Sequence, residues 1–195
     1  MKKPKQNNGA NREHSKTTSD LPEVIGPPYV SEEDFSHLKQ ATFRFRTLNE
    51  ARLLCDLVSS QTFDPIIVGI GLIELMVNAI EHGNLEITYE EKGLLLKQGI
   101  WKKEVERRLN LEKYQERDAT LEYQRNEKLI EVLITDEGDG FDPDKFLQNQ
   151  TPDIKGSVGS QFHGRGIAVA SQLDFKKIEY LGKGNQVRVA IPSEY

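Results

Sequence analysis

The chain has 195 residues, of which 36% are hydrophobic and 29% are charged, and its formal net charge is −5. This length allows one domain with a hydrophobic core and is short for two. The acidic balance favours neither nucleic acid nor a membrane as a partner, and no apolar run approaches the roughly 20 residues that span a bilayer. The single cysteine, Cys55, excludes a disulfide framework within the chain and fits a reducing cytoplasm, where we expect the protein to be located.

The first predicted segment, residues 1–34, is a disordered tail. It is polar, contains four prolines and shows no periodic apolar face before Phe35. Such a composition buries too little apolar surface to offset the entropy lost when the chain is ordered. The remainder, residues 35–195, is predicted to form one domain.

The domain is predicted to begin with a strand and two helices. Residues 42–46 alternate apolar and basic side chains, as a half-buried strand does. Asn49 is the predicted N-cap of the first helix. The second helix is predicted over residues 65–81, because Asp64 can cap it, Pro65 suits the first helical position and Gly83 signals its end. It is apolar on most sides, which indicates a place in the core.

A charged segment, residues 85–118, follows this helix, and about half of it is Lys, Arg, Asp or Glu. Its apolar residues recur at nearly helical spacing, so we predict a helical insertion that lies over the domain. The later predicted elements are strands 120–124 and 129–135, a short helix 167–173, and a hairpin of strands 178–181 and 187–191.

Polar residues interrupt the apolar helix at Glu74 and Asn78. Their spacing of four residues places both on one face, and His82 extends the same stripe by one turn. An unpaired carboxylate is costly to bury, so the stripe predicts one edge of a pocket. The alternative is that Glu74 faces solvent and Asn78 is a local cap.

A second polar segment follows the apolar strand at residues 129–134 and includes Asp136, Gly138 and Gly140. Glycine lacks a Cβ, so such a segment can bring the backbone close to a ligand. A calcium loop is excluded, because Gly138 occupies the third position, where an EF-hand needs an oxygen ligand. An ordinary turn remains the alternative.

A third segment, Gly164-Arg165-Gly166-Ile167, precedes the predicted short helix. Glycines at a helix start leave backbone N–H groups free for a phosphate. The segment lacks the third glycine of a dinucleotide-binding fingerprint and the Gly-Lys-Ser/Thr of a P-loop. Two glycines alone are a weak signal.

In this order, the three segments resemble the motifs of the GHKL (Bergerat-fold) ATPases. Residues 74–83 resemble the N-box, residues 136–141 the first glycine box, and residues 164–167 the second. The similarity covers about residues 40–192, and the nearest branch resembles the small anti-sigma-factor serine kinases. It implies an α/β fold, a two-layer α+β sandwich in which helices cover one face of a mixed, mostly antiparallel sheet.

The resemblance also implies site roles. Asn78 would bind the Mg²⁺ that bridges the ATP phosphates, Glu74 would be the catalytic base, and Asp136 would accept a hydrogen bond from the adenine amino group. Residues 142–162 would form a lid over the nucleotide. The implied ATP-binding residues are Asn78, His82, Asp136, Gly138, Gly140, Phe141, Gly164, Arg165, Gly166 and Ile167.

Two features depart from the family pattern. The insertion at residues 85–118 is longer than the usual connection after the N-box, and Gln186 stands where many members have a threonine that contacts the phosphates. A histidine-kinase phosphoacceptor role for His37 is disfavoured, because the predicted strand leaves no room for a helical hairpin after it.

Two functions follow from the resemblance. In the first, the protein is an ATP- and Mg²⁺-dependent serine/threonine kinase of the anti-sigma-factor type. It would bind a sigma factor and transfer the γ-phosphate to an antagonist protein of the anti-anti-sigma type. A homodimer is also compatible with this function. In the second, it is a nucleotide-dependent protein-binding module with little or no kinase activity, and the insertion is its candidate surface.

Overall fold

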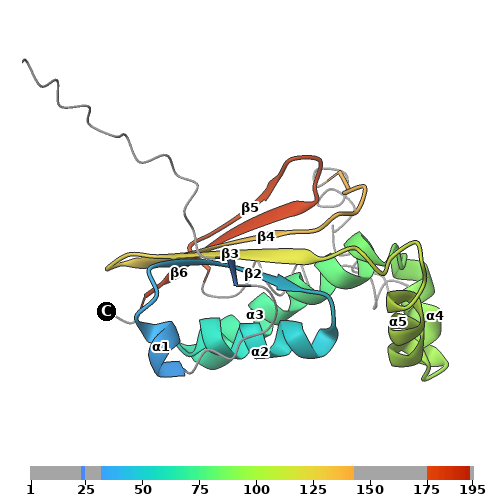
Figure 1. Cartoon of the computed structure of the whole chain (residues 1–195), viewed down its shortest axis with the longest axis horizontal. Coiled ribbons are helices and arrows are strands. Elements are labelled where there is room, and N and C mark those ends of the chain that lie inside the picture. Colours follow the sequence, from blue (N-terminus) through green and yellow to red (C-terminus); the bar gives the residue numbers. More distant parts are fainter. Residues whose placement is uncertain (1–22, 25–31, 143–174, 194–195) are drawn as a thin grey trace, which may run out of the picture.

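The computed structural model describes residues 23–24, 32–142 and 175–193, and within them the chain forms a sheet layer and a helical layer (Figure 1). The helices are α1 (Glu32–Ser36), α2 (Leu48–Ser59), α3 (Pro65–Asn78), the π-helix η1 (Ala79–Asn84), α4 (Tyr89–Lys97) and α5 (Trp101–Leu109). The strands are β1 (Glu23–Val24), β2 (Gln40–Phe45), β3 (Ala119–Arg125), β4 (Leu129–Thr135), β5 (Lys177–Leu181) and β6 (Gln186–Pro192).

The described strands form a six-stranded sheet in the order β1-β2-β3-β4-β6-β5. The β1–β2 pair is parallel and the other pairs are antiparallel. Figure 1 shows α1, α2 and α3 on one face of this sheet. The predicted fold class, a two-layer sandwich with a mixed, mostly antiparallel sheet, is therefore confirmed.

The core lies between the sheet and the helices, where alternate strand residues point. Leu121 and Tyr123 of β3, and Val132 and Ile134 of β4, are buried, whereas the residues between them are exposed or half-buried. The predicted strands 120–124, 129–135, 178–181 and 187–191 all fall within observed strands.

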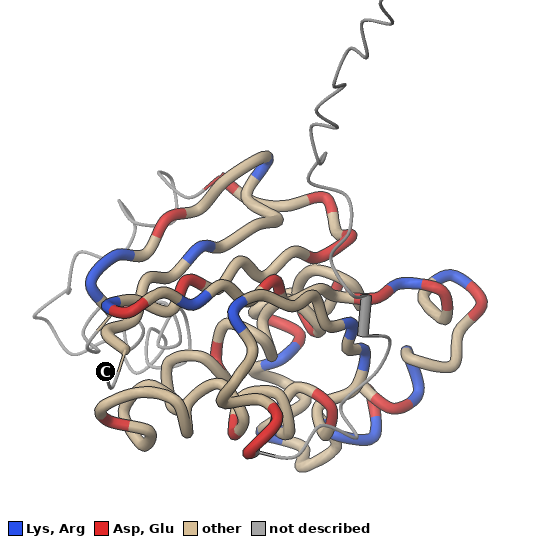
Figure 2. Tube along the Cα trace, turned by 60° about the vertical axis from the view of Figure 1, so that its left-hand side comes forward, with Lys and Arg blue, Asp and Glu red and all other residues tan. Residues whose placement is uncertain are grey.

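The charged residues of both signs are interspersed along the trace in Figure 2, rather than separated into an acidic and a basic region.

The predicted N-cap of α2 is wrong. The helix begins at Leu48, and Thr47 is its N-cap. The Thr47 hydroxyl accepts a hydrogen bond from the Glu50 backbone N–H, and the Glu50 carboxylate accepts one from the Thr47 N–H. This capping box satisfies two backbone donors at once, so it prevails over Asn49, which lies inside the first turn.

Helix α3 begins as predicted, with Pro65 at its start and the Asp64 carboxylate accepting from the Ile67 N–H at 3.0 Å. It continues past the predicted end as η1, which finishes at Asn84. Gly83 therefore does not end the helix. A Cβ at Gly83 would overlap the Asp136 side chain, so the glycine serves a close approach between helix and strand end.

Together α3 and η1 form a 20-residue helix, Pro65–Asn84, that is long and apolar enough to cross a membrane by length and composition alone. The expectation that no apolar run approaches this length is therefore wrong. Half of its most apolar stretch is buried inside the domain, as in the central helix of a layered fold. The helix reaches this length because η1 extends it beyond the predicted end at residue 81.

Two described parts of the predicted disordered tail are structured. β1 pairs with β2, with Glu23 opposite Thr42. α1 begins at Glu32 and places Phe35 in the core, where its ring lies 5.8 Å from the ring of Phe43. The prediction for residues 1–34 is therefore wrong at these points, because partners distant in the sequence compensate for the weak local pattern.

The predicted helical insertion, residues 85–118, contains the two short helices α4 and α5. Figure 1 shows them side by side at one end of the molecule, beyond the helices that cover the sheet. Leu95 and Val105 are buried, but Leu94, which belongs to the predicted apolar stripe, is 58% exposed. The insertion is thus helical as predicted, with a narrower buried face.

Candidate functional site

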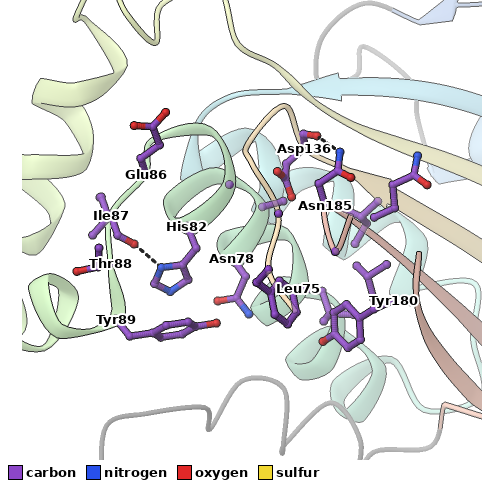
Figure 3. Close-up of a pocket in the computed structure, with 18 residues that line it drawn as sticks. Leu75, Asn78, His82, Glu86, Ile87, Thr88, Tyr89, Asp136, Tyr180 and Asn185 are labelled. Carbon is purple, nitrogen blue, oxygen red and sulfur yellow. Dashed lines mark hydrogen bonds between the residues drawn. The ribbon is translucent and has the colours of Figure 1, made fainter. Parts of the chain in front are cut away.

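A cavity of about 360 Å³ opens where η1, the end of β4 and the β5–β6 turn meet the start of the insertion (Figure 3). It is mainly apolar and contains a small number of polar groups, as small-molecule sites generally do. Its lining residues are Leu75, Asn78, Ala79, His82, Gly83, Glu86, Ile87, Thr88, Tyr89, Ile134, Asp136, Gly140, Phe141, Tyr180, Gly184, Asn185, Gln186 and Val187.

The structure brings together five of the predicted site residues. The cavity is lined by Asn78, His82, Asp136, Gly140 and Phe141, which come from two segments more than fifty positions apart. These two segments approach each other because the end of β4 packs beside η1.

The other predicted site residues lie beside the cavity or outside the described chain. Gly138 is buried next to Asp136, and Glu74 is half-buried on α3, one turn before Asn78. The second glycine box, Gly164, Arg165, Gly166 and Ile167, lies outside the described residues, as do the predicted helix 167–173 and the predicted lid beyond Asp142.

Asp136 is held at the end of β4 by the β5–β6 turn. Its backbone N–H donates to the Asn185 carbonyl at 3.0 Å, and the Asn185 side-chain amide donates to the Asp136 carbonyl at 2.8 Å. The Asp136 carboxylate accepts from the Gly138 N–H at 2.8 Å. Burial raises the pKa of Asp136 to about 6, so at neutral pH it presents a fixed, mostly ionised acceptor.

The glycines around Asp136 serve a different purpose from the predicted one. They were expected to let a ligand approach the backbone, but protein atoms fill the space beside them. A Cβ on Gly138 would lie 2.5 Å from the Gly83 carbonyl oxygen, and one on Gly140 would overlap the Lys183 backbone. The glycines therefore let η1, the β4 end and the β5–β6 turn close together into one wall.

Gly140 also has a φ of +77°, and Gly184 on the facing turn has a φ of +87°. This left-handed backbone is strained for other residues and free for glycine. A Cβ on Gly184 would overlap the backbone of Phe141. Both the conformation and the packing consequently require glycine at this contact.

His82 forms a neutral part of the wall. Its Nδ1–H donates to the Ile87 carbonyl, since a carbonyl can only accept, and the imidazole ring stacks on Tyr89 with centroids 3.9 Å apart. Burial lowers the pKa of His82 to about 4, so the ring carries no charge at neutral pH. His82 can therefore pack against a ligand, or accept a hydrogen bond at Nε2, without supplying positive charge to a phosphate.

Aromatic side chains line the cavity on opposite sides. Tyr89 stands on one side, and Tyr180 and Phe141 stand on the other in an edge-to-face pair with centroids 5.2 Å apart. Burial raises the pKa of Tyr89 to about 12, so its hydroxyl stays protonated. These rings leave a space suited to a flat heteroaromatic group.

The sequence reasoning missed Tyr89 and Tyr180. Tyr89 had been assigned to the insertion, yet only five residues separate it from Gly83, the last N-box position. That proximity was the available signal. Tyr180 precedes the β5–β6 turn, whose Gln186 was already expected near the phosphates, and Gln186 does line the cavity.

Asn78 stands at the junction of α3 and η1. Its side chain makes no capping hydrogen bond, which excludes the alternative of a purely local cap. Figure 3 shows it projecting into the cavity between Tyr89 and the aromatic pair. Because η1 is a π-helix, with more residues per turn than an α-helix, each successive residue turns less around its axis, and such π-helical turns are frequent at functional sites.

The described residues contain no group of three or more His, Cys, Asp or Glu side chains that could hold a metal ion. Asn78 offers one amide oxygen, a ligand that Mg²⁺ accepts. Because Mg²⁺ usually keeps waters and shares its remaining positions with phosphates, one such ligand fits a metal that arrives with a phosphorylated ligand.

A family model described as a histidine kinase-like ATPase domain matches residues 34–191. This range contains all the residues that line the cavity in the described part of the chain, and the whole insertion. No curated protein sequence gave a significant match to the chain.

Proposed function

Because the chain belongs to the histidine kinase-like ATPase domain family, we propose that the cavity binds ATP with Mg²⁺ and that the protein is a regulatory serine/threonine kinase of the anti-sigma-factor type. Family membership carries the ATP-binding and regulatory character. The kinase specificity, the metal and the partners are the proposal.

The observation that carries the proposal is that Asp136 and Asn78 both line one cavity, whose walls also contain aromatic rings. An ionised, fixed carboxylate is the acceptor that the exocyclic amino group of adenine needs. The keto oxygen of guanine would face that carboxylate unfavourably, so Asp136 supports adenine. Tyr89, Phe141 and Tyr180 flank the space where a base would lie.

Asn78 supports the metal assignment. Its amide oxygen would bind the Mg²⁺ that accompanies the phosphates, and the bound metal would neutralise charge as the γ-phosphoryl group transfers. Gly164, Arg165, Gly166 and Ile167 of the second glycine box are the proposed phosphate neighbours, on the strength of the resemblance.

Glu74 is the proposed general base. A serine or threonine hydroxyl of the partner would attack the γ-phosphorus, its proton would pass to the Glu74 carboxylate, and the bond to the bridging oxygen of ADP would break. Glu74 lies one turn before Asn78 on the same helical face, which supports its placement beside the phosphates. Its half-buried position keeps it accessible to a partner hydroxyl.

The test is Glu74→Gln, with Glu122→Gln on the exposed side of β3 as the matched control. We expect Glu74→Gln to bind ATP with unchanged affinity by calorimetry and to lose at least a hundredfold in transfer of labelled phosphate, within the range of a lost general base. Transfer at the rate of the control would overturn the base assignment.

The second candidate is a nucleotide-dependent binding module. The favouring observation is that the insertion supplies Tyr89 to the cavity and also exposes Leu94 and Leu96 on α4. A partner there would sense the nucleotide without being phosphorylated. Incubation with labelled ATP and candidate antagonist proteins distinguishes the two, because the module binds without transferring phosphate.

The partners remain proposals: a sigma factor, an anti-anti-sigma antagonist, and a second copy of this chain, with neither nucleic acid nor membrane among them. Use of ATP and a single buried thiol, Cys55, are consistent with the cytoplasm as the proposed location.

A further inference from the structure

Glu81 is a fully buried carboxylate that the nucleotide site does not use. It lies in η1, between Asn78 and the last turn, and its exposed fraction is 0%. Its counter-charge comes from the insertion, where Lys92 Nζ of α4 lies 2.7 Å from Glu81 Oε2. Burial raises the pKa of Glu81, while Lys92 opposes that rise, and Lys92 Nζ also lies 6.0 Å from the centre of the Trp101 ring on α5.

A buried ion pair is an inefficient way to stabilise a fold. Apolar side chains of similar size often stabilise a core equally well, whereas removal of one charged partner leaves the other buried and unpaired. A buried ion pair instead favours one position of the two secondary-structure elements relative to each other, because its two charged residues must stay in contact. Here those elements are the insertion and η1, which carries the site residue His82 and directly follows Asn78.

The placement matters to the cavity because Tyr89 lies on the same helix as Lys92. The two are three residues apart, so both face η1 from α4. While Lys92 pairs with Glu81, Tyr89 stacks on His82, the residue next to Glu81. The ion pair therefore holds one aromatic wall of the cavity in position.

A second connection secures the segment between η1 and α4. Glu86 adopts a φ of +53°, which is unusual for a residue other than glycine. Arg117 Nη1 lies 2.9 Å from the Glu86 carboxylate, and Lys113 pairs with it as well. Arg108 Nη1 donates to the carbonyls of Leu85 and Glu86.

These contacts come from the far end of the insertion and reach the loop that lines the cavity. Both ends of the insertion thus contact the same cavity wall, which contains Tyr89 and the Glu86 loop. They do so through ion pairs and hydrogen bonds, which are directional. Displacement of the insertion would move Tyr89 and the Glu86 loop together.

We propose that Glu81, Lys92 and Trp101 form a positioning cluster that couples the placement of the α4–α5 insertion to nucleotide occupancy of the cavity. The proposal rests on the proposed binding of ATP. Coupling is reciprocal: a nucleotide that needs Tyr89 in place favours the docked insertion, and docking raises nucleotide affinity by the same factor. Glu81 and Lys92 act through Tyr89 and His82, without touching the nucleotide.

Trp101 makes the coupling measurable, because it is the only tryptophan in the chain and its ring lies beneath the Lys92 ammonium group. In the wild-type protein, addition of Mg-ATP should change Trp101 emission with a saturation curve that matches the Kd measured by calorimetry. Glu81→Gln should weaken Mg-ATP binding at least tenfold and reduce the emission change, since Lys92 loses its counter-charge.

Lys92→Met in the Glu81→Gln background provides a rescue. The double variant has no unpaired charge in the cluster, so we expect an affinity within threefold of wild type and a restored emission change. The matched controls are Lys97→Met on α4 and Glu106→Gln on α5, which remove exposed charges of the insertion. Both should bind Mg-ATP as the wild type does.

The midpoint of thermal unfolding separates positioning from mere stability. If Glu81→Gln lowers only that midpoint, while Mg-ATP affinity and emission change stay at wild-type values in folded protein, the coupling is wrong. If calorimetry detects no nucleotide binding by the wild-type protein, both the proposed function and the coupling fall.

Discussion

The sheet-and-helix core and the α4–α5 insertion are held in place by different combinations of hydrophobic and polar contacts. In the core, apolar side chains such as Phe43, Leu72 and Val132 are completely buried between the layers. In the insertion, fewer apolar side chains are buried, namely Leu85, Ile87, Leu95, Val105 and Tyr114, and ion pairs and hydrogen bonds also fix its position.

The difference teaches where single substitutions act. Hydrophobic burial is non-directional and spread over many residues, so it determines stability. Buried ion pairs and hydrogen bonds are directional, so they determine where one element sits against another. We therefore expect core substitutions to change unfolding, and substitutions around the insertion and the cavity to change nucleotide binding.

The largest expected effect is in the core. Phe43→Ala removes a fully buried ring from β2 and should reduce the free energy of unfolding by about 3–5 kcal/mol, measured by urea denaturation. Leu53→Ala on α2, where the side chain is 46% exposed, is the control and should change it far less. A Phe43→Ala protein that loses nucleotide affinity while still folded would break the separation of roles.

Two glycine substitutions sharpen the comparison at the junction of the regions. Gly83→Ala places a Cβ against the Asp136 side chain and should cost about 1–3 kcal/mol of stability while weakening ATP binding at least tenfold. Gly93→Ala on α4 meets nothing within 4 Å and should stabilise the protein by up to about 1 kcal/mol.

Urea denaturation and calorimetry on both glycine variants check this pair. Wild-type nucleotide affinity in Gly83→Ala would contradict the view that the glycine lets η1 and Asp136 form one wall. Destabilisation by Gly93→Ala would show that α4 packs more closely than its open surroundings indicate.

The smallest effect concerns pH. Because burial raises the pKa of Asp136 to about 6, its carboxylate is an acceptor above that pH and becomes protonated below it. ATP affinity should therefore fall by up to about tenfold between pH 7 and pH 5, as the proposed acceptor for the adenine amino group is lost.

The stability contribution of Asp136 has the opposite sign. The pKa of Asp136 is higher in the folded than in the unfolded protein, so as pH falls the folded state binds the proton first. Protonation of Asp136 therefore stabilises the fold. This stabilisation is fully present below the unfolded pKa and is lost as pH rises through about 6. Titration calorimetry and urea denaturation at several pH values should show the two opposite trends. Both should vanish in Asp136→Asn, and a persisting affinity step would assign the titration to another group.

The sequence alone was sufficient for the elements with strong local patterns. The apolar run at residues 129–134 predicted β4, and Asp64-Pro65 predicted the start of α3, because a short apolar run is typical of a buried strand and cap chemistry acts locally. The resemblance of the motifs carrying Asn78 and Asp136 to those of the GHKL ATPases predicted a nucleotide pocket and the fold class that positions it.

Only the tertiary structure decided what the neighbours of those residues are. Nothing near Val24 in the sequence indicates that it pairs with β2, and nothing near Tyr89 indicates that it completes a wall with His82. Gly83 reads locally as a helix end, but Asp136, far along the chain, makes it an interior glycine. A sequence pattern records the period and capping of one element, whereas burial, close approach and charge pairing depend on which distant element packs beside it.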